Sequence, residues 1–76
     1  MTYGYSQRLI ERNRQADSRH LGVRLGRACI AHQVPVSVVA HEFRVTRQTV
    51  YNWFSGASKP AESVHTLVDA YIAKLA

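Results

Sequence analysis

The chain has 76 residues, 46 % of them hydrophobic, and ten basic against five acidic residues give it a formal net charge of +5. A chain of this length forms one small domain without room for an enclosed active-site cavity, and its apolar content excludes an intrinsically disordered protein. The charge predicts a polyanionic partner because it is uneven: residues 1–27 hold six arginines against Glu11 and Asp17.

A short basic helix is the first predicted element, after a loose end at residues 1–5. Ser6 is a good N-cap for a helix that runs to about Gln15. This helix has too little apolar surface to be stable alone, so it either docks on the domain or becomes ordered on DNA. We therefore divide the chain into 1–18, a basic arm or short helix, and 19–76, the folded domain. Three arginines of the first part form either a solvated face or a DNA-contacting arm: Arg8, Arg12 and Arg14.

The second predicted helix covers roughly residues 19–33, with Ser18 or Asp17 as its N-cap. Its apolar residues recur at helical spacing and form a predicted buried stripe of Leu21, Leu25, Ala28 and Cys29, with Ile30 beside it. Gly22 and Gly26 cost up to ~1 kcal/mol each relative to alanine inside a helix. Their spacing of one turn predicts that a neighbouring segment approaches this helix closely.

The third and fourth predicted helices are separated by a short turn. One helix covers about 36–43, with Pro35 in its first turn, and the next covers about 47–55, with Gly56 as its stop. The turn itself consists of Arg44, Val45 and Thr46, and Thr46 also serves as N-cap of the following helix. The spacing predicts these inward-facing residues: Val39, Ala40, Phe43, Val50 and Trp53. For Phe54 the spacing leaves the orientation open.

A last helix is predicted at about 61–75. Its apolar stripe consists of Val64, Leu67, Val68, Tyr71 and Leu75. Together the elements predict an all-α fold, a compact bundle of four or five helices that contains a helix-turn-helix.

The outward face of the helix at 47–55 carries side chains that can read DNA bases in the major groove: Arg47, Gln48, Tyr51 and Asn52. Arginine pairs bidentately with guanine, and glutamine or asparagine pairs with adenine. The sequence therefore predicts double-stranded DNA as the partner.

From Leu21 to about Leu75 the chain resembles the Cro and phage-repressor type of helix-turn-helix domain, the XRE-like group. The resemblance rests on LGVRL in the second predicted helix, VxVVA in the third, VTRQTVYNW after the turn and GASKP behind the fourth. It implies a lambda-repressor-like fold, a transcriptional regulator of the repressor kind, a homodimer on two operator half-sites, and a phage or mobile-element origin in the bacterial cytoplasm or nucleoid. The helix from Thr46 to Ser55 would be the recognition helix.

The resemblance also implies a set of phosphate contacts: Ser37, Thr46, Ser55, Ser58 and Lys59. Tyr51 would meet a base methyl group or a phosphate. For the dimer interface we weigh two places. One is the last helix, with Ile72, Ala73 and Ala76, and the other is the first helix, with Leu9 and Ile10.

The sequence departs from the family pattern in three respects. Arg44 stands where the family usually has glycine, so the turn either accepts a strain of about 1–2 kcal/mol or has a different geometry. Val36 replaces a polar phosphate contact, which shifts that role to Ser37 or to backbone N–H groups. Cys29 and Phe54 replace a buried ion pair, and an apolar pair can do so at little cost.

Other functional classes find little support in the residues. The chain has no nucleophile elbow, paired carboxylates or phosphate loop, so we expect no enzyme and no cofactor. Cys29, His32 and His41 lack the four-ligand spacing of a zinc site, so no metal is expected. The opening segment lacks the apolar stretch of a signal peptide, and no apolar run reaches the length of a membrane span, so we expect a cytoplasmic protein without membrane contact.

One rival function uses the same scaffold. A small phage or mobile-element protein could bind and inhibit a host protein such as a polymerase or a nuclease. Arg44, Val36 and Val38 make this alternative credible. An apolar Val36 and Val38 on an exposed face would suit a protein partner better than a phosphate.

Overall fold

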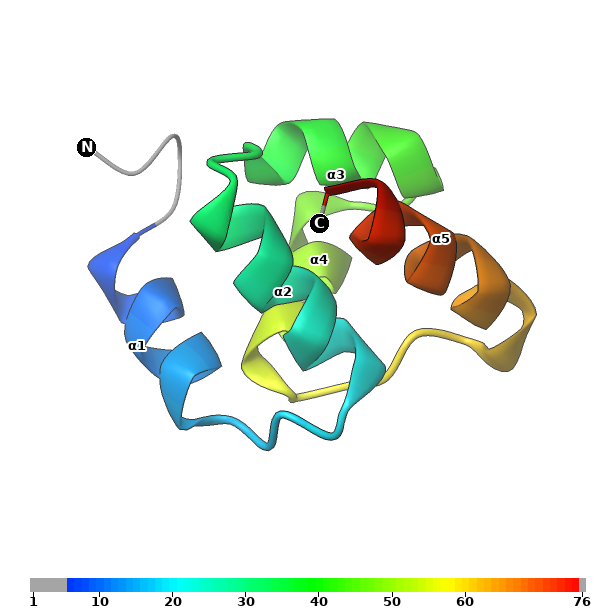
Figure 1. Ribbon diagram of the computed structural model, residues 1–76. Coiled ribbons are helices and arrows are strands. Elements are labelled where there is room, and N and C mark those ends of the chain that lie inside the picture. The colour runs from blue at the N-terminus through cyan, green and yellow to red at the C-terminus, as the bar shows by residue number, and fades with distance from the viewer. Residues whose placement is uncertain (1–5, 76) are drawn as a thin grey trace.

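The computed structural model describes residues 6–75, which form an all-α globule (Figure 1). Its elements are α1 (Gln7–Gln15), α2 (Leu21–Ala31), α3 (Val36–Phe43), α4 (Arg47–Ser55), the 3₁₀ turn η1 (Glu62–Val64) and α5 (His65–Leu75). The predicted fold class, a small bundle of helices, is confirmed. The loose end predicted at 1–5 lies outside the described residues.

Helix α2 lies at the centre of the bundle and packs against α1, α4 and α5, while α3 packs on α4. Helices α1 and α5 lie at opposite ends of the molecule (Figure 1). One continuous core joins the helices: Leu9, Leu25, Cys29, Val36, Val39, Ala40, Val50, Trp53, Phe54 and Val68. Phe54, whose orientation the sequence left open, is fully buried.

Local capping explains where α1 begins and where α4 begins and ends. The backbone N–H of Leu9 donates to Ser6 Oγ at 3.0 Å, and that of Thr49 donates to Thr46 Oγ1 at 3.1 Å. Gly56 closes α4 with a left-handed backbone, φ 82°. These caps and the stop at Gly56 are confirmed.

The predicted cap of the second helix is wrong. Helix α2 begins at Leu21, and His20 occupies the N-cap position without a side-chain hydrogen bond. Asp17 instead accepts hydrogen bonds from the backbone N–H of Arg19 at 2.9 Å and from its guanidinium at 2.8 Å. The guanidinium hydrogen bond holds the pKa of Asp17 well below its usual range. Asp17 is therefore engaged in its own turn before the helix starts.

Of the two alternatives for the turn between α3 and α4, the structure has the strained one. Arg44 adopts a left-handed backbone with φ 55° and ψ 46°. Two hydrogen bonds hold it: the N–H of Val45 donates to the carbonyl of Ala40 at 3.0 Å, and the N–H of Arg44 donates to that of His41 at 3.3 Å. This pattern satisfies two carbonyls at the end of α3 and compensates the strain of a non-glycine residue. Helix, turn and helix thus form a compact unit.

Helix α1 docks on the domain instead of standing free. Leu9 enters the core, and the buried Asn13, 3 % exposed, lies one turn further along the same face. Asn13 Nδ2 donates to the carbonyl of Phe54 at 2.7 Å and to that of Val23 at 3.2 Å. Of the two alternatives for this segment, docking is confirmed for residues 7–15. The buried role of Asn13 was not predicted.

The two glycines of α2 allow the close approach that their spacing predicts. A Cβ atom on Gly22 would lie 2.8 Å from the carbonyl oxygen of Trp53, and one on Gly26 would lie 2.8 Å from the ring of Phe54. Helix α4 therefore lies against α2 almost backbone to backbone.

Two predictions about the last helix are wrong. Residues 62–64 form a 3₁₀ turn, so the α-helix begins only at His65. Leu67 is 59 % exposed, whereas its neighbour Val68 is fully buried. The reason is angular: α5 packs only through a narrow stripe, and Leu67 lies about 100° away from Val68 around the helix.

Burial of Cys29 predicts a specific loss of stability at alkaline pH. Desolvation raises the pKa of the thiol from 9.0 to about 12. The unfolded chain therefore loses this proton first, and the stabilisation is complete below pH 9.0 and disappears as pH rises towards 12. We expect the stability advantage of the parent chain over Cys29→Ala, measured by urea unfolding, to shrink between pH 8 and pH 10.5. A constant difference would mean that the thiol is not desolvated in the fold.

Candidate nucleic-acid interface

The outward face of α4 carries the four predicted base-reading residues. Arg47 and Gln48 are exposed, and Tyr51 and Asn52 are half-buried. The opposite face of the helix enters the core through these residues: Val50, Trp53 and Phe54. The predicted inward orientation of Val50 and Trp53 is confirmed, so the polar side chains are those that α4 presents on the surface.

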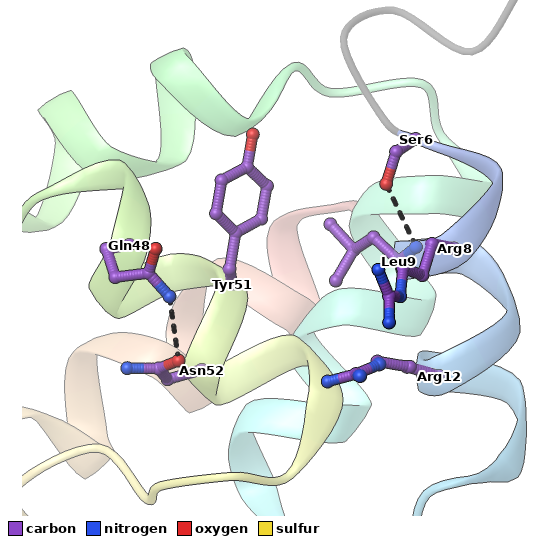
Figure 2. Close-up of a pocket in the computed structure, with 7 residues that line it drawn as sticks. All are labelled: Ser6, Arg8, Leu9, Arg12, Gln48, Tyr51 and Asn52. Carbon is purple, nitrogen blue, oxygen red and sulfur yellow. Dashed lines mark hydrogen bonds between the residues drawn. The ribbon is translucent and has the colours of Figure 1, made fainter.

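Two amide side chains of this face are held together. Gln48 Nε2 donates to Asn52 Oδ1 at 3.1 Å, one turn along the helix (Figure 2). The bond uses one donor and one acceptor, and it leaves the amide oxygen of Gln48 and the NH₂ group of Asn52 for other partners. The pair therefore offers a fixed acceptor and a fixed donor, the combination that an adenine edge complements.

Helix α1 forms the second wall of an open groove over this face. The groove has a volume of about 450 Å³ and is lined by Ser6, Arg8, Leu9, Arg12, Gln48, Tyr51 and Asn52. Figure 2 shows Arg12 extending from α1 towards α4, with the guanidinium of Arg8 beside it near Leu9. The seven lining residues include Arg8 and Arg12 and no acidic residue, and these charges favour a positive potential in the groove.

The three arginines predicted as arm contacts do not act as one group. Arg8 and Arg12 lie one turn apart on one flank of the buried Leu9 and Asn13. Arg14 lies on the other flank, where it lines a separate hollow with Ile10, Asn13, Arg27, Ile30 and Ala31. The helical period explains the split, because residues 12 and 14 differ by about 200° around the helix.

The predicted phosphate contacts are dispersed. Ser37, Thr46, Ser58 and Lys59 are exposed, and Ser55 is half-buried. The hydroxyl of Ser55 and the backbone N–H of Ser58 both donate to the carbonyl of Asn52, at 3.4 and 3.2 Å, and so close the end of α4. Lys59 lies apart from the groove, in a hollow with Arg19, His20, Leu21, Pro60 and His65.

The structure corrects the predicted dimer surface at one residue. Leu9 is buried in the core, so it is not available to a second copy, and Ile10 is half-buried. On α5, Ile72 packs partly against the core and Ala73 is exposed. Ala76 lies outside the described residues.

The three residues considered for a metal site have different surroundings. Cys29 is buried in the core, and His32 and His41 are exposed. Within residues 6–75 no group of three or more histidine, cysteine, aspartate or glutamate side chains is placed to hold a metal ion. None of the helices in that range combines the length and the apolar character needed to cross a bilayer.

The groove between α1 and α4 was missed by the sequence reading. The available signal was the position of Asn13, one turn after Leu9 on the apolar side of α1, where a polar residue needs a buried partner. That partner, the carbonyl of Phe54, is 41 positions away in the sequence.

Comparison with family models, with curated proteins and with solved structures found no match to this chain.

Proposed function

We propose that the protein is a sequence-specific double-stranded DNA-binding transcriptional regulator of the repressor kind, which reads operator half-sites with α4. The observation that carries the proposal is the outward face of α4, where Arg47 and Tyr51 lie beside the hydrogen-bonded amide pair of Gln48 and Asn52. These side chains match the hydrogen-bonding pattern of base edges in the major groove.

Three further features support the same function. The tight turn at Arg44 lets α4 follow α3 after only three residues. Helix-turn-helix proteins have such a turn, and their second helix enters the major groove. The net charge of +5 favours a polyanion. The XRE-like resemblance of residues 21–75 implies the same use of α4.

A single helix reads only a few base pairs, so we propose a homodimer on two half-sites about 34 Å apart. The exposed side of α5 with Ile72 and Ala73 is the proposed interface. Sedimentation of the complex with its preferred duplex tests this part, since a complex with one copy per duplex would contradict it.

The rival function, inhibition of a host protein, loses one of its three supports, and the second, Arg44, has a role in the turn that ends α3. Val36 is 3 % exposed and belongs to the core, so it cannot contact a partner. Val38 is 47 % exposed and remains on the surface of α3. A lone exposed valine is common on soluble proteins, and we therefore do not propose this function.

Arg47→Ala should weaken binding to the preferred duplex by ~1–3 kcal/mol and relax the preference at one base-pair position per half-site. Lys59→Ala should weaken binding to all sequences alike and make the salt dependence less steep, because a phosphate contact carries no sequence information. The preferred duplex is found by selection from random duplexes, and binding is measured by fluorescence anisotropy between 50 and 200 mM salt.

Circular dichroism is the control that tests whether both variants are folded. Equal losses of Arg47→Ala on preferred and random duplexes would make Arg47 a phosphate contact and move base reading to Gln48, Tyr51 or Asn52. If the parent chain fails to bind any duplex at 50 mM salt, the proposed function is wrong and the host-protein alternative takes its place.

A further inference from the structure

Helix α1 lies outside the part of the chain that resembles helix-turn-helix domains, yet it borders the face proposed to read DNA. Arg8 and Arg12 stand across the groove from Gln48, Tyr51 and Asn52 (Figure 2). The ion pairs among residues 6–75 involve Arg19, His20 and Arg24 and leave both guanidinium groups without an acidic partner. Two exposed arginines without an acidic partner are free to bind an anion beside the polar face of α4.

The position of α1 relative to α4 is fixed by buried contacts. Leu9 enters the core, and Asn13 Nδ2 donates to the carbonyl of Phe54 in the last turn of α4 at 2.7 Å. The guanidinium of Arg27 donates to the carbonyls of Arg14 and Ala16, both at 3.1 Å, and so satisfies the end of α1. The arginines of α1 are therefore carried on a rigid element, not on a loose arm.

The width of the major groove determines where α1 lies when α4 binds DNA. The major groove is about 12 Å wide, and a helix with its side chains is about 10–12 Å across, so the groove accepts α4 alone. A helix packed beside α4, at an axial distance of about 8–10 Å, must then lie over the sugar-phosphate strand that borders the groove.

The geometry points to Arg8 and Arg12 as a pair of phosphate clamps on the strand that flanks the bases facing α4. This inference rests on the proposed function and adds a second element to its interface. The two side chains lie four residues apart, about 6 Å along α1, and guanidinium forks bind phosphate oxygens bidentately. Arg14, on the opposite flank of α1, has no place in this contact.

A comparison of variants within α1 tests the pair. We expect the double variant Arg8→Ala/Arg12→Ala to bind preferred and random 20-base-pair duplexes about 10-fold or more weakly at 100 mM salt, with the preference between them unchanged. The slope of log affinity against log salt should fall by about 1.8 for each copy on the duplex, roughly 0.9 for each lost phosphate contact, and so by about 3.6 for the proposed dimer. The matched control, Arg14→Ala, removes the same charge from the same helix and should be closer to the parent chain in affinity and slope.

A conservative variant distinguishes a phosphate contact from a structural role. Arg8→Lys/Arg12→Lys keeps both charges, so it should keep most of the salt slope, and thermal melting shows whether each variant is as stable as the parent. Equal losses in the Arg8/Arg12 and Arg14 alanine variants would overturn the clamp and leave only a general charge effect. The same conclusion follows if the slope is unchanged in the folded double variant while the parent still binds DNA. Failure of the parent itself to bind at 50 mM salt is a different result, which overturns the proposed function and the clamp with it.

Discussion

Replacing Trp53 with alanine is expected to lower the free energy of unfolding by ~3–5 kcal/mol, a large part of the stability of so small a domain. The side chain is 5 % exposed, and its ring meets that of Phe43 edge to face at 6.0 Å. Truncation leaves a cavity between α2, α3 and α4 that the close contact at Gly22 prevents from collapsing. Thermal or urea unfolding followed by circular dichroism measures the effect.

Leu67→Ala is the control for this variant, because it removes a large apolar side chain that is 59 % exposed. Its effect should stay within about 0.5 kcal/mol. If Trp53→Ala melts like Leu67→Ala, then Trp53 does not anchor the core and the orientation of α4 is wrong. The outward face of that helix, and with it the proposed interface, would then have to be assigned again.

Gly22→Ala tests the packing of α2 on α4 through the sign of its effect. Helix propensity alone predicts that alanine stabilises α2 by up to ~1 kcal/mol. The added Cβ would, however, lie 2.8 Å from the carbonyl oxygen of Trp53 and 2.9 Å from its Cβ, and backbone atoms move only together with the whole helix. Overpacking of this kind costs about 1–3 kcal/mol. We therefore expect a net destabilisation in urea unfolding.

A gain in stability would show that α2 and α4 do not approach as closely as the structure indicates. Under the proposed function, DNA binding by the folded Gly22→Ala variant provides a second readout. Displacement of α4 from α2 also shifts its carbonyl at Phe54 away from Asn13, the residue that holds α1 beside the groove. Affinity should therefore fall more than the loss of stability alone explains.

Short-range features of the chain were readable from the sequence by itself. Ser6 and Thr46 cap their helices because each hydroxyl needs only the N–H three residues ahead. Gly56 ends α4 because a glycine accepts a left-handed backbone without cost. The inward position of Trp53 follows from its spacing to Val50. Each of these depends on neighbours within one turn of helix, so the local sequence determines it.

The tertiary structure alone decided the features that depend on distant partners. Apolar spacing could not tell that Leu67 faces solvent, because the width of the buried stripe on α5 depends on what packs against it. Asn13 can be buried because the carbonyl of Phe54, far along the chain, accepts a hydrogen bond from its side-chain amide. The division of the arginines, with Arg8 and Arg12 in the groove and Arg14 outside, follows from that docking of α1. The sequence determined which residues α4 turns outward, and the fold decided what stands beside them.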